Sequence, residues 1–144
     1  MIHFHAKYSH WWVIPKGQFF HEMATDFNKK IVDVQYILVD DEELLEINKK
    51  FLQHDYYTDI ISFPLGTSQR IRGEIYISAD RVRENALEIG VDKEFEMARV
   101  IIHGLLHFFG LEDSTSEEKQ KMRMMEDKYL SRLFADEKNF STNK

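Results

Sequence analysis

The sequence predicts an α+β fold, in which one small mixed sheet is surrounded by about five helices. Short segments with the alternating pattern of strands are interspersed with longer segments of helical periodicity, and no internal repeat or linker separates them. A chain of 144 residues that is 43% hydrophobic is long enough for one core and too short for two ordinary domains. We therefore expect a single domain over residues 1–144.

The first half of the chain predicts two strands and two helices. A strand is expected near 2–5. A helix over 18–30 follows the breaker pair Pro15 and Gly17, because Phe19, Phe20, Met23 and Phe27 recur at helical spacing. The segment 32–39 alternates and then becomes uniformly apolar, which is typical of a sheet strand. Asp40 and Asp41 are suited to cap a second helix that runs through Phe51.

The second half predicts two more strands and three helices. The strands are expected over 59–64 and 73–78, and a helix over 79–89 ends at Gly90. The helix over 93–109 is apolar almost all round from Met97 onward, so it should be central and buried. Residues 114–118 resemble an N-cap and acidic first turn for a last helix, and the polar tail 136–144 is expected to fray.

Charge and composition narrow the possible partners. The net charge of −6 argues against broad affinity for nucleic acid, so a nucleic-acid role would need a local basic cleft. The absence of cysteine agrees with a reducing compartment. The N-terminal segment lacks the pattern of a signal peptide, and no apolar run approaches the length of a membrane span. We expect a cytoplasmic protein without a membrane partner or a nucleotide cofactor; its oligomeric state is left open.

The segment 100–113 contains a metal-site pattern. His103 and His107 are four residues apart, so on a helix both imidazoles lie on one face and can reach the same ion. Gly110 falls where a left-handed cap would turn the chain back and bring Asp113 over the two histidines. Three protein ligands would leave one position open for water, as in catalytic zinc sites. The predicted metal ligands are His103, His107 and Asp113.

Gly104 decides which class of metal site is favoured. The spacing His-x3-His-x2-Gly-x2-Asp matches that of the metzincin proteases, but Gly104 stands where those enzymes have a glutamate as general base. Glycine cannot accept a proton, so a metalloprotease is the weaker interpretation. Glycine also costs about 1 kcal/mol in a helix interior relative to alanine, which suggests that another group approaches the backbone closely there.

Three segments together resemble the bacterial YbeY endoribonucleases, which are also described as rRNA maturation factors. The segments are 48–64 with its Thr-Asp-Ile-Ile-Ser-Phe-Pro core, 73–78 with Gly-Glu-Ile-Tyr-Ile-Ser, and the His-Gly-Leu-Leu-His segment that begins at His103. The resemblance implies a single-domain, zinc-dependent, single-strand-specific endoribonuclease that binds one zinc ion. It also implies action in 16S rRNA 3′-end maturation and ribosome quality control, with ribosomal RNA and the small ribosomal subunit as partners.

Two positions depart from the family pattern. Asp113 stands where the family usually has a third histidine, although a carboxylate is also a competent zinc ligand. Leu52 stands where the family commonly has an arginine that is thought to hold substrate phosphate. Lys50 or His54 could supply that cation, phosphate could be held elsewhere, or the activity could be weak; of these we favour His54. We further predict a locally basic rim around His103, with some of the following cations near it: Lys49, Lys50, His54, Arg70 and Arg72.

The expected mechanism uses zinc to lower the pKa of a bound water and to polarise a phosphate oxygen. No dedicated base is evident: Glu112 is the nearest candidate, and the 2′-hydroxyl of the RNA is another possible nucleophile. Thr58 and Asp59 could either cap the backbone or line the cleft. A noncatalytic ribosome assembly factor with a structural metal remains the main alternative to the enzyme.

Overall fold

The computed structural model describes residues 1–7 and 9–141, and within them it has five α-helices and one four-stranded sheet. The strands are β1 (Ile2–Ala6), β2 (Lys30–Val39), β3 (Ile60–Pro64) and β4 (Arg70–Ser78). The helices are α1 (Gly17–Asp26), α2 (Asp41–Leu52), α3 (Ala79–Ile89), α4 (Lys93–Phe108) and α5 (Ser116–Phe134). The predicted α+β class, with a single mixed sheet, is therefore confirmed.

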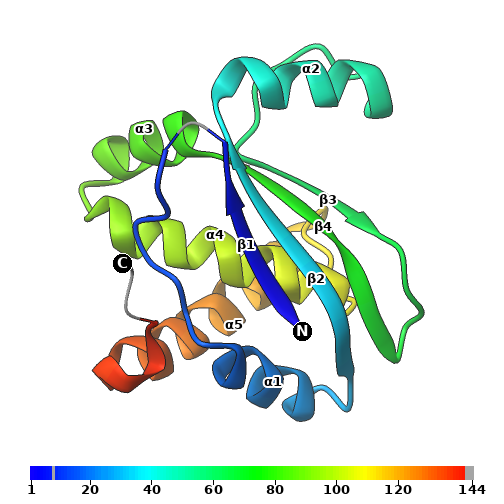
Figure 1. Ribbon diagram of the computed structural model, residues 1–144, viewed down its shortest axis with the longest axis vertical. Helices are drawn as coiled ribbons and strands as arrows, with labels where there is room; N and C mark the ends of the chain where they lie inside the picture. Colours follow the sequence, from blue (N-terminus) through cyan, green and yellow to red (C-terminus); the bar gives the residue numbers. More distant parts are fainter. Residues whose placement is uncertain (8, 142–144) are drawn as a thin grey trace.

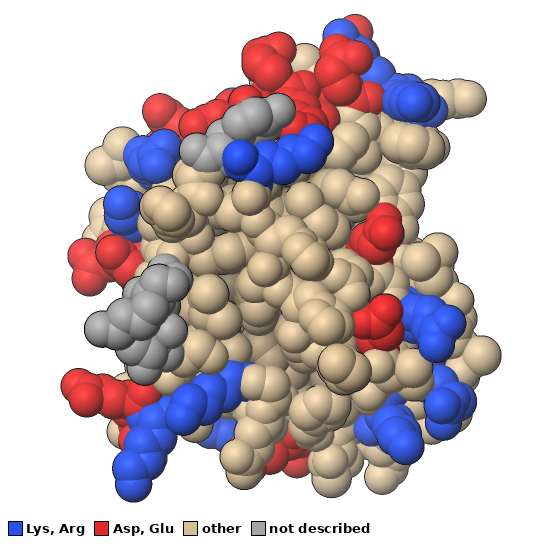
Figure 2. All heavy atoms as spheres, in the orientation of Figure 1, with Lys and Arg blue, Asp and Glu red and all other residues tan. Residues whose placement is uncertain are grey.

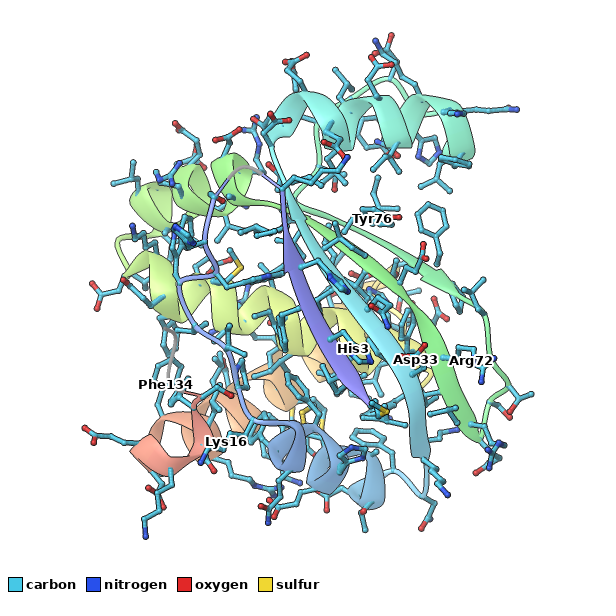
Figure 3. All side chains as sticks on the ribbon, in the orientation of Figure 1. His3, Lys16, Asp33, Arg72, Tyr76 and Phe134 are labelled. Atoms are coloured by element: carbon cyan, nitrogen blue, oxygen red, sulfur yellow. The ribbon has the colours of Figure 1, made fainter. Side chains whose placement is uncertain are left out.

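The sheet has the strand order β1-β2-β4-β3. β1 and β4 run parallel to β2 on either side of it, whereas β3 pairs antiparallel with β4 at the edge. In Figure 1 the strands cross the front of the molecule and α4 lies behind them, with α5 packed beneath α4. Figure 2 looks onto the other face of the sheet and shows few charged side chains across its centre. His3, Asp33 and Arg72 project from that face (Figure 3).

The metal-site helix α4 is the centre of the core, as predicted. Ile101, Ile102 and Leu105 are fully buried, and the buried hydroxyl of Tyr36 on β2 donates a hydrogen bond of 2.8 Å to the carbonyl oxygen of Ile101. This bond satisfies a polar group that would otherwise cost free energy in the core. It also fixes the position of α4 against the sheet.

The helix ends follow the predicted capping residues. Asp40 caps α2 by accepting from the backbone N–H of Glu43, and Gly90 ends α3 with a positive φ of 85°. Thr115 and Glu118 form a reciprocal capping box at the start of α5. Among the described residues, no helix has both the length and the apolar character needed to span a membrane.

Several boundaries differ from the prediction: β4 begins at Arg70 instead of residue 73 and β2 at Lys30 instead of residue 32, and the first helix and the tail differ as well. The first helix ends at Asp26 instead of continuing to Lys30, because Lys30 already pairs with Arg70 in the sheet. The tail that was expected to fray is held as far as Ser141: residues 137–139 form a 3₁₀ turn, and Phe140 packs against the core and bridges to Pro15. Residues 142–144 lie outside the described residues. Burial of the Phe140 ring explains why this polar segment is anchored.

Candidate metal centre

Three side chains converge where the sequence predicted a metal site. The Nε2 atoms of His103 and His107 each lie 3.4 Å from Oδ2 of Asp113. The two imidazole rings are 4.5 Å apart and nearly perpendicular. One ligand atom from each residue lies within 4.8 Å of the other two, so the group could hold a metal ion.

The turn after α4 brings Asp113 to the histidines. Gly110 has a φ of 104°, the left-handed conformation expected of it. The N–H of Leu111 donates to the carbonyl oxygen of Leu106, and the N–H of Gly110 donates to that of His107, so the end of α4 is closed by local hydrogen bonds. A side chain at Gly110 would strain this turn and displace Asp113.

The other ring nitrogen of each histidine already has a partner. Nδ1 of His107 lies 2.9 Å from the carbonyl oxygen of Leu111, and Nδ1 of His103 lies 2.6 Å from Oε2 of Glu126. Because a carbonyl oxygen only accepts, His107 carries its proton on Nδ1 and leaves the Nε2 lone pair free. Both Nε2 atoms are thus directed at Asp113, the arrangement that metal-ligating histidines adopt.

The spacing of these atoms fits a small transition-metal ion. In tetrahedral coordination with bonds of about 2 Å, neighbouring ligand atoms are roughly 3.3 Å apart. Both 3.4 Å separations from Asp113 meet that requirement. Three ligands also leave a coordination position for water or substrate.

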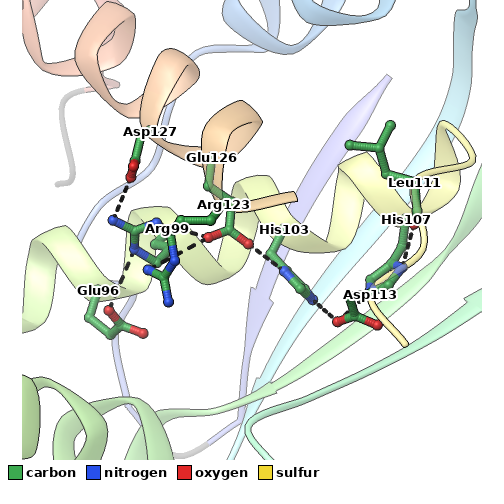
Figure 4. A network of polar contacts seen from close by, with 9 residues as sticks. All are labelled: Glu96, Arg99, His103, His107, Leu111, Asp113, Arg123, Glu126 and Asp127. Carbon is green, nitrogen blue, oxygen red and sulfur yellow. Dashed lines mark hydrogen bonds and ion pairs between the residues drawn. The ribbon is translucent and has the colours of Figure 1, made fainter. Parts of the chain in front are cut away.

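Glu126 connects this cluster to a wider polar network, drawn in Figure 4. It is a buried carboxylate on α5, and its second oxygen accepts a 2.8 Å hydrogen bond from Arg99. Arg99 also bonds Asp127 at 2.9 Å and lies 4.0 Å from the buried Glu96. The network holds α4 against α5 at the level of His103.

The network shifts the pKa values of both partners. Burial opposes the charge on His103, but the hydrogen bond and charge of Glu126 outweigh it and raise the pKa of the imidazole. Burial likewise opposes the charge on Glu126, yet His103 and Arg99 hold the pKa of that carboxyl below its ordinary value. The pair therefore holds a proton on His103 more firmly than an isolated imidazole would, so a metal ion competes with that proton for the histidine.

Close packing of α4 against the sheet explains why position 104 is a glycine. A Cβ at this position would lie 2.9 Å from Cδ1 of Ile60 and 3.1 Å from Cδ1 of Ile75. The close approach that the sequence predicted is therefore made by side chains of β3 and β4. Gly104 lets the metal-site helix lie close to these two strands.

Two hollows border the site. One, of about 270 Å³, is lined by Asp59, Glu96, Arg99, Val100, His103, Asp113, Arg123 and Glu126. The other, of about 280 Å³, is lined by His103, Asp113, Lys119, Met122, Arg123 and Glu126. Of the two roles considered for Asp59, its side chain has the second and lines the cleft. Its backbone carbonyl oxygen accepts a hydrogen bond from the backbone N–H of Ser78. Burial raises the pKa of the Asp59 carboxyl.

His54 and Glu112 do not line either hollow. His54 is exposed and contacts Tyr56, whose hydroxyl lies 2.9 Å from its Nδ1. Glu112 is also exposed, although it precedes Asp113. The structure does not bring these two side chains together with the histidine pair, and their catalytic roles stay predictions.

The cations that line the two hollows differ from those predicted near the rim. Lys49, Lys50, His54, Arg70 and Arg72 are absent from the lining of both hollows, and Arg70 and Arg72 line a separate hollow with Leu65. The cations beside His103 are Arg99, Lys119 and Arg123. They come from α4 and α5, because the packing of these two helices determines which side chains surround the site.

Sequence reasoning missed Glu126 and Arg123 and did not place Arg99 at the metal centre. One signal was available for Glu126, which is a charged residue four positions after Met122 and three before Tyr129 on the buried face of α5. A carboxylate on a buried face requires a partner. The identity of that partner depends on how α5 crosses α4.

The fold and the site define a class of small α+β proteins whose central helix presents an open, three-ligand site suited to a metal ion. Residues 16–134 match the family described as endoribonuclease YbeY. The chain belongs to this family.

Relatives and a solved structure agree with the assignment. A protein from Bacteroides thetaiotaomicron named endoribonuclease YbeY is 41% identical over 109 residues, which cover 76% of this chain and 80% of the relative. One of the same name from Flavobacterium psychrophilum is 46% identical over 112 residues, covering 78% and 79% of the two chains. The solution structure of a Thermotoga maritima protein is similar with a TM-score of 0.63 and 30% identity, covering 94% of this chain and 90% of that one.

Proposed function

We propose that this protein is a zinc-dependent endoribonuclease that cleaves single-stranded RNA, with one zinc ion held by His103, His107 and Asp113. The observation that carries the proposal is the convergence of two Nε2 atoms on Oδ2 of Asp113 at 3.4 Å. Membership in the endoribonuclease YbeY family supports RNA as the substrate class. The neutral imidazoles and carboxylate suit zinc among the transition metals.

The chain's own residues prepare the site for hydrolysis. Glu126 and the carbonyl oxygen of Leu111 hold the two imidazoles with Nε2 directed at Asp113. The hollow shared with Asp59 leaves space beside the ligands for a phosphodiester group and a water molecule. A zinc ion bound there would supply water activation near neutral pH and polarisation of a phosphate oxygen.

We further propose a cellular role in 16S rRNA 3′-end maturation and ribosome quality control, in the cytoplasm and together with the small ribosomal subunit. The basis is the resemblance of the sequence to the family, which carries these roles. The hollows beside the predicted ligands leave room for a single-stranded RNA end.

Leu52 favours a second candidate, a noncatalytic assembly factor whose metal stabilises the fold. It lies exposed at the end of α2 and offers no charge where the family commonly has an arginine. An assembly factor would dock on the ribosome without cleaving RNA. The metalloprotease interpretation has less support, because Gly104 faces the sheet and provides no base.

Cleavage assays on the purified protein distinguish these candidates. With zinc added, we expect cleavage of a single-stranded RNA and much slower cleavage of a matched duplex. Chelator and the double variant His103→Ala, His107→Ala should abolish it. The double variant His3→Ala, His5→Ala is the matched control, because His3 projects from the opposite face of the sheet (Figure 3) and the ring of His5, two positions along β1, stacks on that of His3.

Each outcome has a defined meaning. Zinc-dependent cleavage that only the His103 and His107 variant loses supports the enzyme. Cleavage that survives loss of both histidines would indicate a contaminating nuclease and overturn the assignment. RNA binding without cleavage by the zinc-loaded protein would favour the assembly factor.

A further inference from the structure

A chain of three hollows leads away from the candidate metal centre along α5. The two that border His103 are described above, and a third, of about 620 Å³, is lined by Ser116, Lys119, Gln120, Arg123 and Met124. Arg123 lines all three hollows and Lys119 lines two of them. These two cations therefore connect the metal centre with the surface of α5.

Most of the hydrogen-bond donors of the Arg123 guanidinium are available to a ligand. Its side chain is 60% exposed, and its ion-pair distance to Oε1 of Glu126 is 4.0 Å. That oxygen already accepts a 2.8 Å hydrogen bond from Arg99. Arg99 differs from Arg123 because it is mostly buried and bound on two sides by carboxylates. Arg99 holds the structure together, whereas the guanidinium of Arg123 is available to a ligand.

Lys119 complements Arg123 on the same face of the helix. The two residues are four positions apart, which places their side chains next to each other on an α-helix. Within the part of the chain that the structure describes, no ion pair is found for Lys119. The third hollow has these two cations and no carboxylate in its lining.

The charges that line these hollows indicate which kind of ligand would bind along α5. One of the two hollows that border His103 contains four carboxylates, from Asp59, Glu96, Asp113 and Glu126. These groups repel an anionic strand unless cations at the rim hold its phosphates. A guanidinium with an adjacent ammonium is suited to phosphate oxygens, the first by its planar donors and the second as a point charge.

We propose that Arg123 and Lys119 form the phosphate-binding edge of the RNA path, holding the backbone of a single strand where it leaves the metal centre along α5. The inference rests on the proposed endoribonuclease function and names the residues that bind its substrate. It assigns the phosphate-holding role to α5, although the family pattern would place a cation where this chain has Leu52.

The test is RNA binding by the full-length protein over a salt series. The double variant Lys119→Gln, Arg123→Gln should bind a fluorescein-labelled single-stranded RNA about tenfold more weakly at low salt. The slope of log Kd against log salt should fall by about 1.4, since each phosphate contact on a single strand contributes roughly 0.7. Zinc affinity should stay within about twofold of that of the unchanged protein, because neither residue is a predicted metal ligand.

Lys121→Gln, Lys128→Gln provides a matched control. It removes the same charge from the same helix, but neither lysine lines the hollows, and Lys128 lies over the ring of Tyr129. Equal weakening by the two double variants would overturn the phosphate-binding edge, because net charge alone would then explain the loss. Loss of zinc together with loss of RNA binding in Lys119→Gln, Arg123→Gln would also overturn it.

The outcome for the unchanged protein separates the two proposals. If it binds and cleaves RNA while the two double variants behave alike, the endoribonuclease assignment stands and the path along α5 is wrong. If the unchanged, zinc-loaded protein neither binds nor cleaves RNA, the proposed function fails, and the role of Arg123 and Lys119 fails with it.

Discussion

Nδ1 of His103 lies 2.6 Å from Oε2 of Glu126, a contact between α4 and α5 that joins the candidate metal centre to the packing of two helices. The carboxylate determines which imidazole nitrogen is free to bind a metal ion. Such partners are typical of metal-ligating histidines, and they raise the basicity of the ligand. The position of α5 is therefore part of the metal site, although α5 supplies none of its three predicted ligands.

Glu126→Gln should weaken zinc binding by about 10- to 100-fold, the range expected when the partner of a ligating histidine is altered. The amide keeps the size of the side chain but loses the negative charge that faces Nδ1 of His103. Competition with a chromophoric chelator measures the affinity. Asp127→Asn is the matched control, because Asp127 bonds Arg99 but does not contact His103. Equal affinities for Glu126→Gln and the unchanged protein would remove Glu126 from the site.

Asp113 should contact the metal directly. Asp113→Ala is expected to weaken zinc binding by more than tenfold, or about 1.4 kcal/mol, because one of three protein ligands is lost. Asp113→His should retain binding, since imidazole is an equally competent ligand. The same chelator competition applies to both variants. Unchanged affinity in Asp113→Ala would transfer the ligand role to Glu112 or to water.

Gly104→Ala should lower the free energy of unfolding by about 1 kcal/mol. Overpacking costs about 1–3 kcal/mol, because the new Cβ would meet Ile60 at 2.9 Å; a gain of about 1 kcal/mol in helix propensity offsets part of it. Urea unfolding followed by circular dichroism measures the difference. Gly17→Ala is the control, because nothing lies within 4 Å of a Cβ there. If Gly104→Ala instead raised the free energy of unfolding, the side chains of Ile60 and Ile75 would have to move aside at little energetic cost.

Tyr129→Phe should destabilise the protein at pH 7 by about 1 kcal/mol, the usual net value of a hydrogen bond. The hydroxyl of Tyr129 donates to Asp26 at 2.8 Å, and this bond, assisted by Arg132, holds the pKa of the Asp26 carboxyl below its ordinary value. A depressed pKa contributes stability above the unfolded-state pKa, and that contribution is lost as the pH falls through the folded-state pKa.

The destabilisation caused by Tyr129→Phe should therefore shrink as the pH falls from about 4, the ordinary pKa of an aspartate, through the lower pKa of the Asp26 carboxyl in the folded protein. Urea unfolding at pH 7 and at pH 3 measures the change. In an Asp26→Asn background, the effect of Tyr129→Phe should no longer depend on pH. A constant difference across the pH range in the original background would assign the effect to packing of the ring.

The local sequence determined the elements and the three predicted ligands. Helical periodicity, the caps at Asp40 and Gly90 and the alternation of the strands depend on residues within a few positions of each other. The same holds for His103 and His107, whose spacing places them on one helix face, and for the turn at Gly110. These features were predictable because the backbone geometry of a single helix or turn decides them.

Only the tertiary structure decided what surrounds the ligands. Glu126 meets His103 from 23 positions away, and Arg123 reaches the same cleft because α5 crosses α4 at that level. The sequence pointed instead to cations such as Arg70, which the sheet places at a separate hollow. Contacts between distant elements depend on how two buried faces pack, and the pattern along one helix defines its apolar face without specifying which residue of another helix will meet it.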